Sequence, residues 1–144
     1  NMVGGQAIDF AAVGCTLDIA ELENMQIHKT GALIRAAVKL AALSAPGLDH
    51  DTLQQLDHYA KCVGLAFQIR DDILDIEGDV ALLGKRQGAD MALNKPTYPS
   101  LLGLPEAKER ARCLHEEALA SLAKLDERAE PLRGLSHYIV ARAH

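Results

Sequence analysis

Apolar residues recur every three or four positions along most of this chain, a spacing that predicts helices. The longest pattern begins at Asp49 or Asp51 and is expected to end at Gly78. A helix of about 28 residues would span roughly 42 Å. Its first apolar positions, which keep a 3,4,3,4 spacing, are Leu53, Leu56, Ala60, Val63 and Phe67. This stretch is therefore the expected central helix.

Shorter helical patterns lie on both sides of the central helix. Residues 6–13 are weakly amphipathic, and Asp18 is expected to cap a helix that begins at Ile19. Beyond it, residues 31–43 predict a strongly buried segment that ends at Pro46-Gly47. After a loosely patterned stretch, residues 107–125 and 132–142 predict two further helices.

The central helix carries acids close to its expected end. At 100° per residue, Asp72, Asp75 and Gln68 all lie within about 100° of Asp71, and apolar residues flank this acid arc on both sides. Carboxylates one turn apart repel each other by about 0.2–0.5 kcal/mol, so folding alone does not favour the cluster. A bound Mg2+, which prefers oxygen ligands and completes its shell with water and phosphate, would offset the repulsion.

The acid arc therefore predicts a site for Mg2+ and a diphosphate, opening into the interior of a helix bundle. Of the neighbouring charged residues, Arg70 and Glu77 are expected to face water. A solvated acidic face is the alternative. By the same repulsion argument, Asp71→Ala is expected to leave metal-free stability unchanged or slightly higher.

Composition narrows the class of protein. The 144 residues suffice for one domain, and the abundance of Ala and Leu with no Trp favours an all-α helix bundle over a sheet. The net charge of -5, without a basic stripe, argues against a nucleic-acid partner. No apolar run reaches the length of a membrane span.

The cysteines and histidines give no local site signal. Three cysteines far apart and without C-x-x-C spacing argue against a zinc site and a disulfide framework, and favour a reducing cytoplasm. The six histidines show no ligand spacing, so core or surface roles are expected for them rather than catalysis. The chain begins at Asn1-Met2 without a signal-peptide pattern, so we expect it to be part of something larger.

Two basic segments could meet an anion near the acid arc. Lys29-Thr30 stands beside an apolar helix, where the lysine could contact a charged group and the hydroxyl could orient a developing cation. Lys85 lies in a glycine-framed loop fourteen residues after Asp71. The alternatives are a snorkelling lysine and a solvated loop lysine.

Together these motifs resemble those of the trans-isoprenyl diphosphate synthases, in order and in approximate spacing. The matching segments are Gly5-Gln6-x-x-Asp9, Lys29-Thr30-Gly31, Phe67-Gln68-x-x-Asp71-Asp72-x-x-Asp75 with Gly78-Asp79, Gly84-Lys85-x-x-Gly88-x-Asp90, and Lys95 with Thr97-Tyr98-Pro99. The resemblance is to the C-terminal half of bacterial farnesyl (geranyl) diphosphate synthases, and it covers essentially the whole chain.

The resemblance implies that residues 1–144 are the C-terminal half of a single all-α domain with the isoprenoid synthase fold. It implies a Mg2+-dependent enzyme that joins an allylic diphosphate to isopentenyl diphosphate, giving a short-chain farnesyl or geranyl product. Asp71 would bind Mg2+ directly, and Asp72 and Asp75 would order its waters. The implied catalytic residues are Lys29, Thr30, Gln68 and Lys85, and those implied to bind substrate are Lys29, Gln68, Lys85, Gln6, Asp9 and Lys95.

The chain departs from this family in one respect, because it contains no first aspartate-rich motif with adjacent arginines. We therefore expect it to be inactive alone and to expose apolar surface on residues 31–43 and on the central helix, whereas the full-length form would be a homodimer. The alternatives are a non-catalytic helical subunit or binding module of a prenyl synthase assembly, and a terpene cyclase. Lys29-Thr30 and the Lys85 loop argue against the cyclase.

Overall fold

The computed structural model describes residues 2–11, 17–83 and 96–142, with the backbone alone for 9–11 and 79–83. Within these ranges every regular element is helical, which confirms the all-α prediction. The elements are α1 (Met2–Ala11), α2 (Ile19–Gln26), the π-helical turn η1 (Ile27–Gly31), α3 (Ala32–Ser44), α4 (His50–Leu83), α5 (Tyr98–Leu102), α6 (Leu104–Ser121), the 3-10 turn η3 (Glu127–Ala129) and α7 (Glu130–Ala141).

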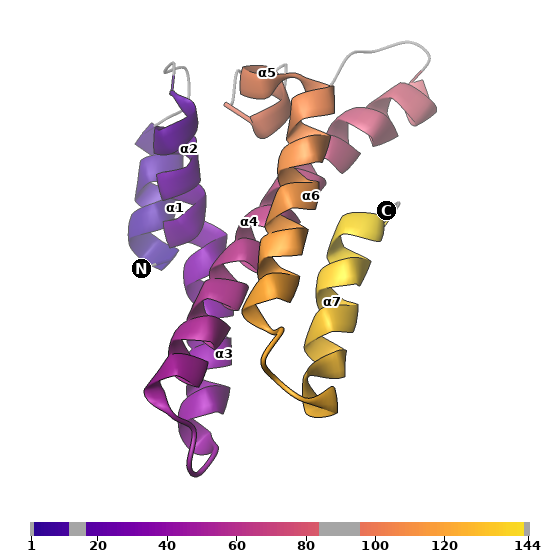
Figure 1. Cartoon of the computed structure of the whole chain (residues 1–144). Coiled ribbons are helices and arrows are strands. Elements are labelled where there is room, and N and C mark those ends of the chain that lie inside the picture. Colours follow the sequence, from indigo (N-terminus) through magenta and orange to yellow (C-terminus); the bar gives the residue numbers. More distant parts are fainter. Residues whose placement is uncertain (1, 12–16, 84–95, 143–144) are drawn as a thin grey trace.

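Helix α4 runs through the middle of the molecule and the other elements pack around it (Figure 1). In this view α1 and α2 lie to the left of α4, α3 lies behind its lower half, α6 crosses in front of it and α7 lies to its right. The most extensive packing is between α4 and α6. None of the helices in the described ranges is long and apolar enough to cross a membrane.

Helix α4 continues past the glycine that was expected to end it. Asp49 caps its start, because Thr52 N donates to Asp49 Oδ1 at 2.7 Å. A helix-ending glycine needs a positive φ, but among the described glycines only Gly47 and Gly103 have one. The expected end at Gly78 is therefore wrong, and the helix extends to Leu83.

The segments predicted at residues 19 and 31 form one continuous helical path. Asp18 caps α2 as expected, and Glu21 completes a capping box. Instead of breaking near Lys29-Thr30, the chain passes through η1 directly into α3. A π-helical turn adds one residue per turn and is frequent at functional sites.

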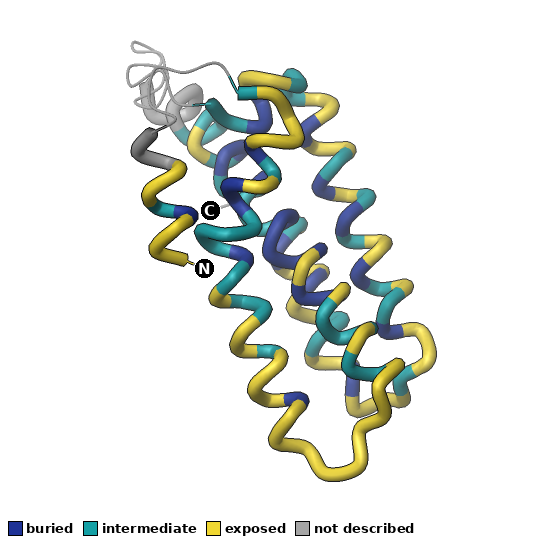
Figure 2. Tube along the Cα trace, turned by 90° about the vertical axis from the view of Figure 1, so that its left-hand side faces the viewer, coloured by how far each residue is buried: buried dark blue, intermediate teal, exposed yellow. Residues whose placement is uncertain are grey.

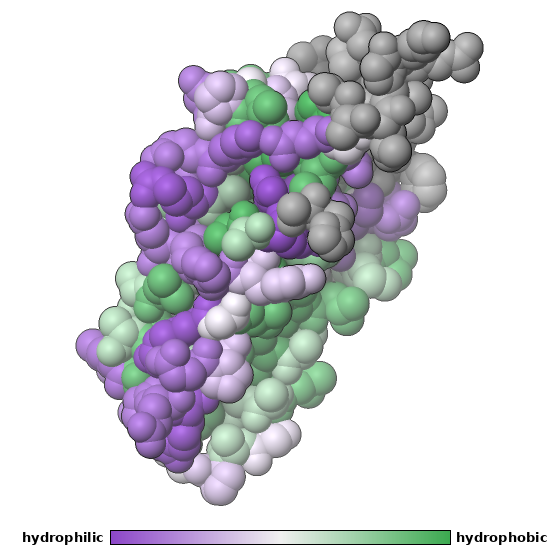
Figure 3. Space-filling view, turned by 90° about the vertical axis from the view of Figure 1, so that its right-hand side faces the viewer, coloured by the Kyte–Doolittle hydropathy of each residue, from purple (hydrophilic) through white to green (hydrophobic). Residues whose placement is uncertain are grey.

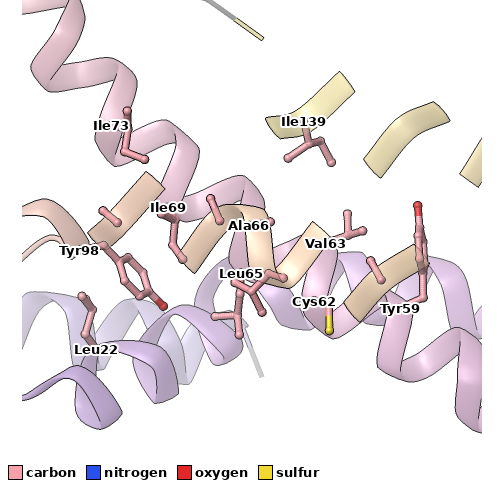
Figure 4. Packing of buried hydrophobic residues seen from close by; sticks show 14 of the residues in the cluster. Leu22, Tyr59, Cys62, Val63, Leu65, Ala66, Ile69, Ile73, Tyr98 and Ile139 are labelled. Carbon is pink, nitrogen blue, oxygen red and sulfur yellow. The ribbon is translucent and has the colours of Figure 1, made fainter. Parts of the chain in front are cut away.

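The core forms where α4 meets α2, α5, α6 and α7. Leu22, Ile69 and Tyr98 are fully buried and lie close together, although they come from three different elements (Figure 4). The inward face predicted for α6 is confirmed by burial of Ala111, Leu114, Ala118 and Leu122. Helix α6 begins at Leu104, three residues earlier than expected, because Gly103 turns the chain at φ 86 and Pro105 is tolerated in the first helical turn. Helix α5 was not predicted.

Helix α3 exposes most of its apolar side chains. Leu33, Leu40 and Leu43 are more than 60% exposed, and only Ala42 of this helix is buried. Figure 2 shows this as a largely yellow and teal tube with a single blue position. The prediction of a strongly buried segment is therefore wrong for this chain, whereas the expected apolar exposure of residues 31–43 is confirmed.

Helix α3 is attached to α4 partly through charge. Arg35 donates two hydrogen bonds to Asp57, at 3.0 and 2.6 Å. Over residues 50–78, where the side chains of α4 are described, none of its large apolar residues is exposed, and Ile69 and Ile73 are fully buried. The apolar exposure that we expected for this helix is therefore not seen in that range. On the side where α7 lies, hydrophilic residues cover one part of the surface and hydrophobic residues another (Figure 3).

Candidate metal and diphosphate site

The turn η1 lies against α1 at a point where only glycine fits. A Cβ atom on Gly5 would lie 2.2 Å from Lys29 N and 2.5 Å from His28 C. On the other side of the turn, a Cβ on Gly64 of α4 would lie 3.2 Å from Gly31 Cα. These glycines let the backbones of α1 and α4 approach the turn closely, and so they fix where Lys29 and Thr30 sit.

An open groove of about 640 Å³ lies beside the contact between α1 and η1. It is lined by Met2, Val3, Gln6, Ala7, Lys29, Thr30, Leu33 and Ile34. Three predicted site residues, Gln6, Lys29 and Thr30, therefore share one concave surface, although Gln6 is far from the other two in sequence. The remaining lining is apolar, which suits a hydrocarbon chain attached to a polar head.

A path of hydrogen bonds links the turn to the acid arc. Thr30 Oγ1 donates to Gln68 Oε1 at 3.3 Å, and Gln68 Nε2 donates to Asp72 Oδ1 at 3.1 Å. The other oxygen of Asp72 accepts from the backbone N–H of Tyr98 at 3.2 Å. Three motifs that are far apart in the sequence therefore meet at one place.

Asp72 is the buried member of the acid arc, at 8% exposure. Burial raises its pKa from 3.8 to about 6, although the hydrogen bonds from Tyr98 and Gln68 oppose this, and the charges of Asp71 and Asp75 raise it further. Because both of its oxygens accept from N–H groups, Asp72 is held in one orientation and is less free to contact an ion directly.

The Asp71 side chain is half exposed, and it forms an ion pair with Arg142, the residue after α7. Arg142 Nη2 donates to Asp71 Oδ1 at 3.0 Å, and the guanidinium lies 4.4 Å from the centre of the Phe67 ring. Arg70 Nη2 donates to Arg142 O at 2.6 Å and fixes this residue from the other side. Sequence reasoning missed Arg142, because it lies 71 positions from its partner and carries no local signal.

The expectation that Arg70 and Glu77 face water is wrong for Arg70. Its side chain is only 15% exposed, because it lies against the end of α7. Glu77 is 36% exposed and forms an ion pair with Lys108 at 2.6 Å. Contacts between residues far apart in sequence therefore cover part of the face of α4 that was expected to be exposed to solvent.

The donors of the acid arc fit Mg2+, in the mode in which the ion keeps most of its water. Asp75 is exposed and lies one turn from Asp71 on the same face of α4. A site that surrounds an ion with protein ligands needs their oxygens close together. Within the described parts of the chain, Asp71, Asp72 and Asp75 do not bring oxygens from all three side chains within 4.8 Å of one another. Mg2+ commonly uses one or two carboxylates and fills its shell with water and phosphate, which is what Asp71 and Asp75 offer.

Several predicted site residues lie outside the described part of the chain. Lys85 and Lys95 fall in the range 84–95, and the side chains of Asp9 and Asp79 are not described. Their roles stay predictions.

Comparisons with known proteins identify the family of this chain. A sequence profile of the polyprenyl synthetase family matches residues 1–132. The farnesyl diphosphate synthase of Escherichia coli (strain K12) is 52% identical over 145 residues, covering 99% of this chain and 48% of that protein. A crystal structure of an FPP/GFPP synthase from Zymomonas mobilis matches with a TM-score of 0.81 and 37% identity, over 96% of this chain and 45% of that one.

A geranyltransferase from Helicobacter pylori, crystallised with magnesium and isoprenyl diphosphate, matches with a TM-score of 0.76 and 28% identity. The match covers 97% of this chain and 46% of that one. The chain thus spans about half the length of the relatives that it matches. With a family profile that covers most of its residues, the chain belongs to the polyprenyl synthetase family.

Proposed function

We propose that the protein containing this chain is a Mg2+-dependent trans-prenyltransferase. It would join an allylic diphosphate to isopentenyl diphosphate and release a short-chain prenyl diphosphate, farnesyl or geranyl. The observation that carries the proposal is the path from Thr30 through Gln68 to Asp72, because it connects a groove with an apolar lining to a cluster of acids. A substrate with a hydrocarbon chain and a diphosphate head needs both surfaces side by side.

The acids and lysines would hold the diphosphate. Asp71 and Asp75 offer oxygens to Mg2+, while Asp72 anchors the arc to Gln68 and to the start of α5. Bound there, Mg2+ would neutralise negative charge on the departing diphosphate. The ammonium groups of Lys29, Lys85 and Lys95 would donate to phosphate oxygens, and for Lys29 this is supported by its place in the groove.

The oxygens of Thr30 and Gln68 would face the hydrocarbon side of the reaction. Both are part-buried and hydrogen-bonded to each other, so their dipoles are fixed before substrate binds. Fixed dipoles stabilise a developing positive charge without the cost of reorganisation. Gln6 lines the same groove, and we assign it to substrate binding together with Asp9.

We assign residues 1–144 to the C-terminal half of one prenyltransferase domain, which we expect to act as a homodimer in full-length form. Cys62 and Cys113 are free thiols, which supports a reducing cytoplasm as the location. The chain presents one wall of a site, so we expect no prenyl transfer from the 144-residue chain alone.

A hybrid enzyme tests this function directly. The chain would replace the stretch of the Escherichia coli farnesyl diphosphate synthase to which it aligns. We expect this hybrid to turn over geranyl diphosphate with isopentenyl diphosphate when Mg2+ is present, and to lose turnover when Mg2+ is chelated. A folded hybrid that binds diphosphate but never forms a longer prenyl product would instead support the non-catalytic binding module.

A further inference from the structure

A second set of ligand-type side chains lies between α4 and α6, away from the acid arc. It consists of His58 and Cys62 of α4 and Glu117 of α6, whose ligand atoms all lie within 4.8 Å of one another. His58 and Cys62 are one helical turn apart and so share a face of α4. Sequence reasoning missed this pair, because its third member comes from another helix, 55 residues after Cys62.

The two distances from Cys62 to its neighbours are close to the edges of a metal tetrahedron. Cys62 Sγ lies 3.7 Å from His58 Nε2 and 3.8 Å from Glu117 Oε2. Bond lengths of about 2.3 Å for Zn–S and 2.0–2.2 Å for Zn–N and Zn–O give tetrahedral edges of about 3.6 Å. Both distances from Cys62 Sγ therefore need to shorten by only a few tenths of an ångström, and the ligand atoms of His58 and Glu117 lie within 4.8 Å of each other.

The three side chains differ in how far they are buried. Cys62 is 2% exposed and belongs to the core cluster, whereas His58 and Glu117 are exposed. Three protein ligands with one side open to water are typical of metal sites that keep an exchangeable position. In Figure 4, Cys62 lies on α4 within the same cluster as Val63 and Tyr59.

The metal-free state has to lose a proton before this site can form. Burial and the nearby Glu117 carboxylate raise the pKa of the Cys62 thiol to about 11, while Lys61 and Arg110 act weakly in the opposite direction. The thiol therefore stays protonated near neutral pH and donates to Glu117. A divalent ion displaces that proton when it binds a thiolate, and the freed carboxylate oxygen then becomes available as the third ligand.

We propose that His58, Cys62 and Glu117 form a second metal site, selective for Zn2+ or a similar transition-metal ion and separate from the Mg2+ arc. A mixed set of sulfur, nitrogen and oxygen ligands suits Zn2+, whereas Mg2+ takes oxygen alone. Asp71 lies nine residues after Cys62 on α4, about 13.5 Å along the axis and about 180° around it. One ion therefore cannot serve both sites, and the second ion would join α4 to α6.

Cobalt provides the test, because thiolate-bound Co2+ has a sulfur-to-metal charge-transfer absorption. Co2+ and then Zn2+ are titrated into the full chain under reducing conditions, and the titration is repeated on the hybrid enzyme. We expect the absorption to rise to one ion per chain, to vanish when Zn2+ is added and to be unaffected by Mg2+. Zn2+ should also raise the melting temperature, because it binds the folded state alone.

Matched variants assign the signal to these three residues. Cys62→Ser should abolish the absorption, and His58→Gln and Glu117→Gln should weaken Co2+ binding by more than the roughly 10–100-fold lost with an outer-shell partner. Cys113→Ser is the control, since Cys113 also contacts a carboxylate, Glu109, at 3.7 Å. Glu117→Gln alters an exposed residue, so it remains informative if Cys62→Ser unfolds.

The proposal is overturned if Co2+ produces no charge-transfer absorption in the folded wild type. It is equally overturned if Glu117→Gln binds as tightly as wild type, or if Cys113→Ser removes the signal. None of these readouts depends on prenyl transfer, so they are independent of the proposed enzyme activity.

Discussion

Replacing Gly5 with alanine tests whether the contact between α1 and η1 positions the site. The new methyl would lie 2.2 Å from Lys29 N, whereas ordinary Cβ contacts begin at 3.4 Å, so the backbones must separate by about 1.2 Å. Because the atoms it meets are backbone atoms, a rotamer change cannot relieve the clash. Overpacking costs about 1–3 kcal/mol, and we expect the upper end of this range.

The strain should separate α1 from the rest of the chain before it unfolds the core. Helix α1 packs chiefly on η1 and α2, whereas the most extensive packing joins α4 to α6. In hydrogen exchange, Gly5→Ala should lose protection in α1 and η1 but keep it in α4 and α6. In the hybrid enzyme, a shift of about 1 Å at Lys29 and Thr30 should lower kcat/KM by about 100-fold.

Two other glycines give a graded control. Gly64→Ala meets Gly31 Cα at 3.2 Å, so it needs only a small adjustment and should have an intermediate effect. Gly78→Ala meets nothing within 4 Å inside α4 and should raise the free energy of unfolding by about 0.5–1 kcal/mol. If Gly5→Ala keeps α1 protected and turns over like wild type, the close contact does not position the site and our reasoning is refuted.

Three further predictions concern the acid arc and its loop. Asp71→Ala should destabilise the metal-free protein by about 1 kcal/mol, contrary to the expectation from repulsion alone, because the largely buried Arg142 loses its carboxylate; turnover of the hybrid should fall by about 100-fold or more. In the metal-free protein, the raised pKa of Asp72 contributes to the stability of the folded state. The contribution is fully present below pH 3.8 and is lost as pH rises through about 6. Asp72→Asn loses one of the two hydrogen bonds that Asp72 accepts, a cost that does not depend on pH. Relative to wild type, its free energy of unfolding should therefore rise by up to about 3 kcal/mol between pH 3 and pH 7, as chelator-treated urea titrations would show; an equal difference from wild type at both pH values would contradict this. Lys85→Ala should lower kcat/KM of the hybrid with little change in melting temperature, and a large stability loss with normal kinetics would assign this lysine to the fold.

The sequence by itself determined the features that depend on neighbours within one or two helical turns. Asp18 and Asp49 cap helices because an aspartate reaches the N–H groups two or three residues ahead. The inward face of α6 and the shared face of Asp71 and Asp75 follow in the same way from 3.6 residues per turn. The motifs were enough to indicate the family, since a motif consists of residue types and spacings and needs no coordinates.

Only the tertiary structure decided how the acids differ from one another. Asp72 is buried beneath Tyr98 whereas Asp71 meets Arg142, and both partners lie far away in sequence. The meeting of Cys62 with Glu117 has the same origin. A helical repeat fixes the direction of each side chain about its own axis, but which distant helix packs on that side is set by burial of the whole core. That is why the locally similar acids at 71 and 72 have different environments.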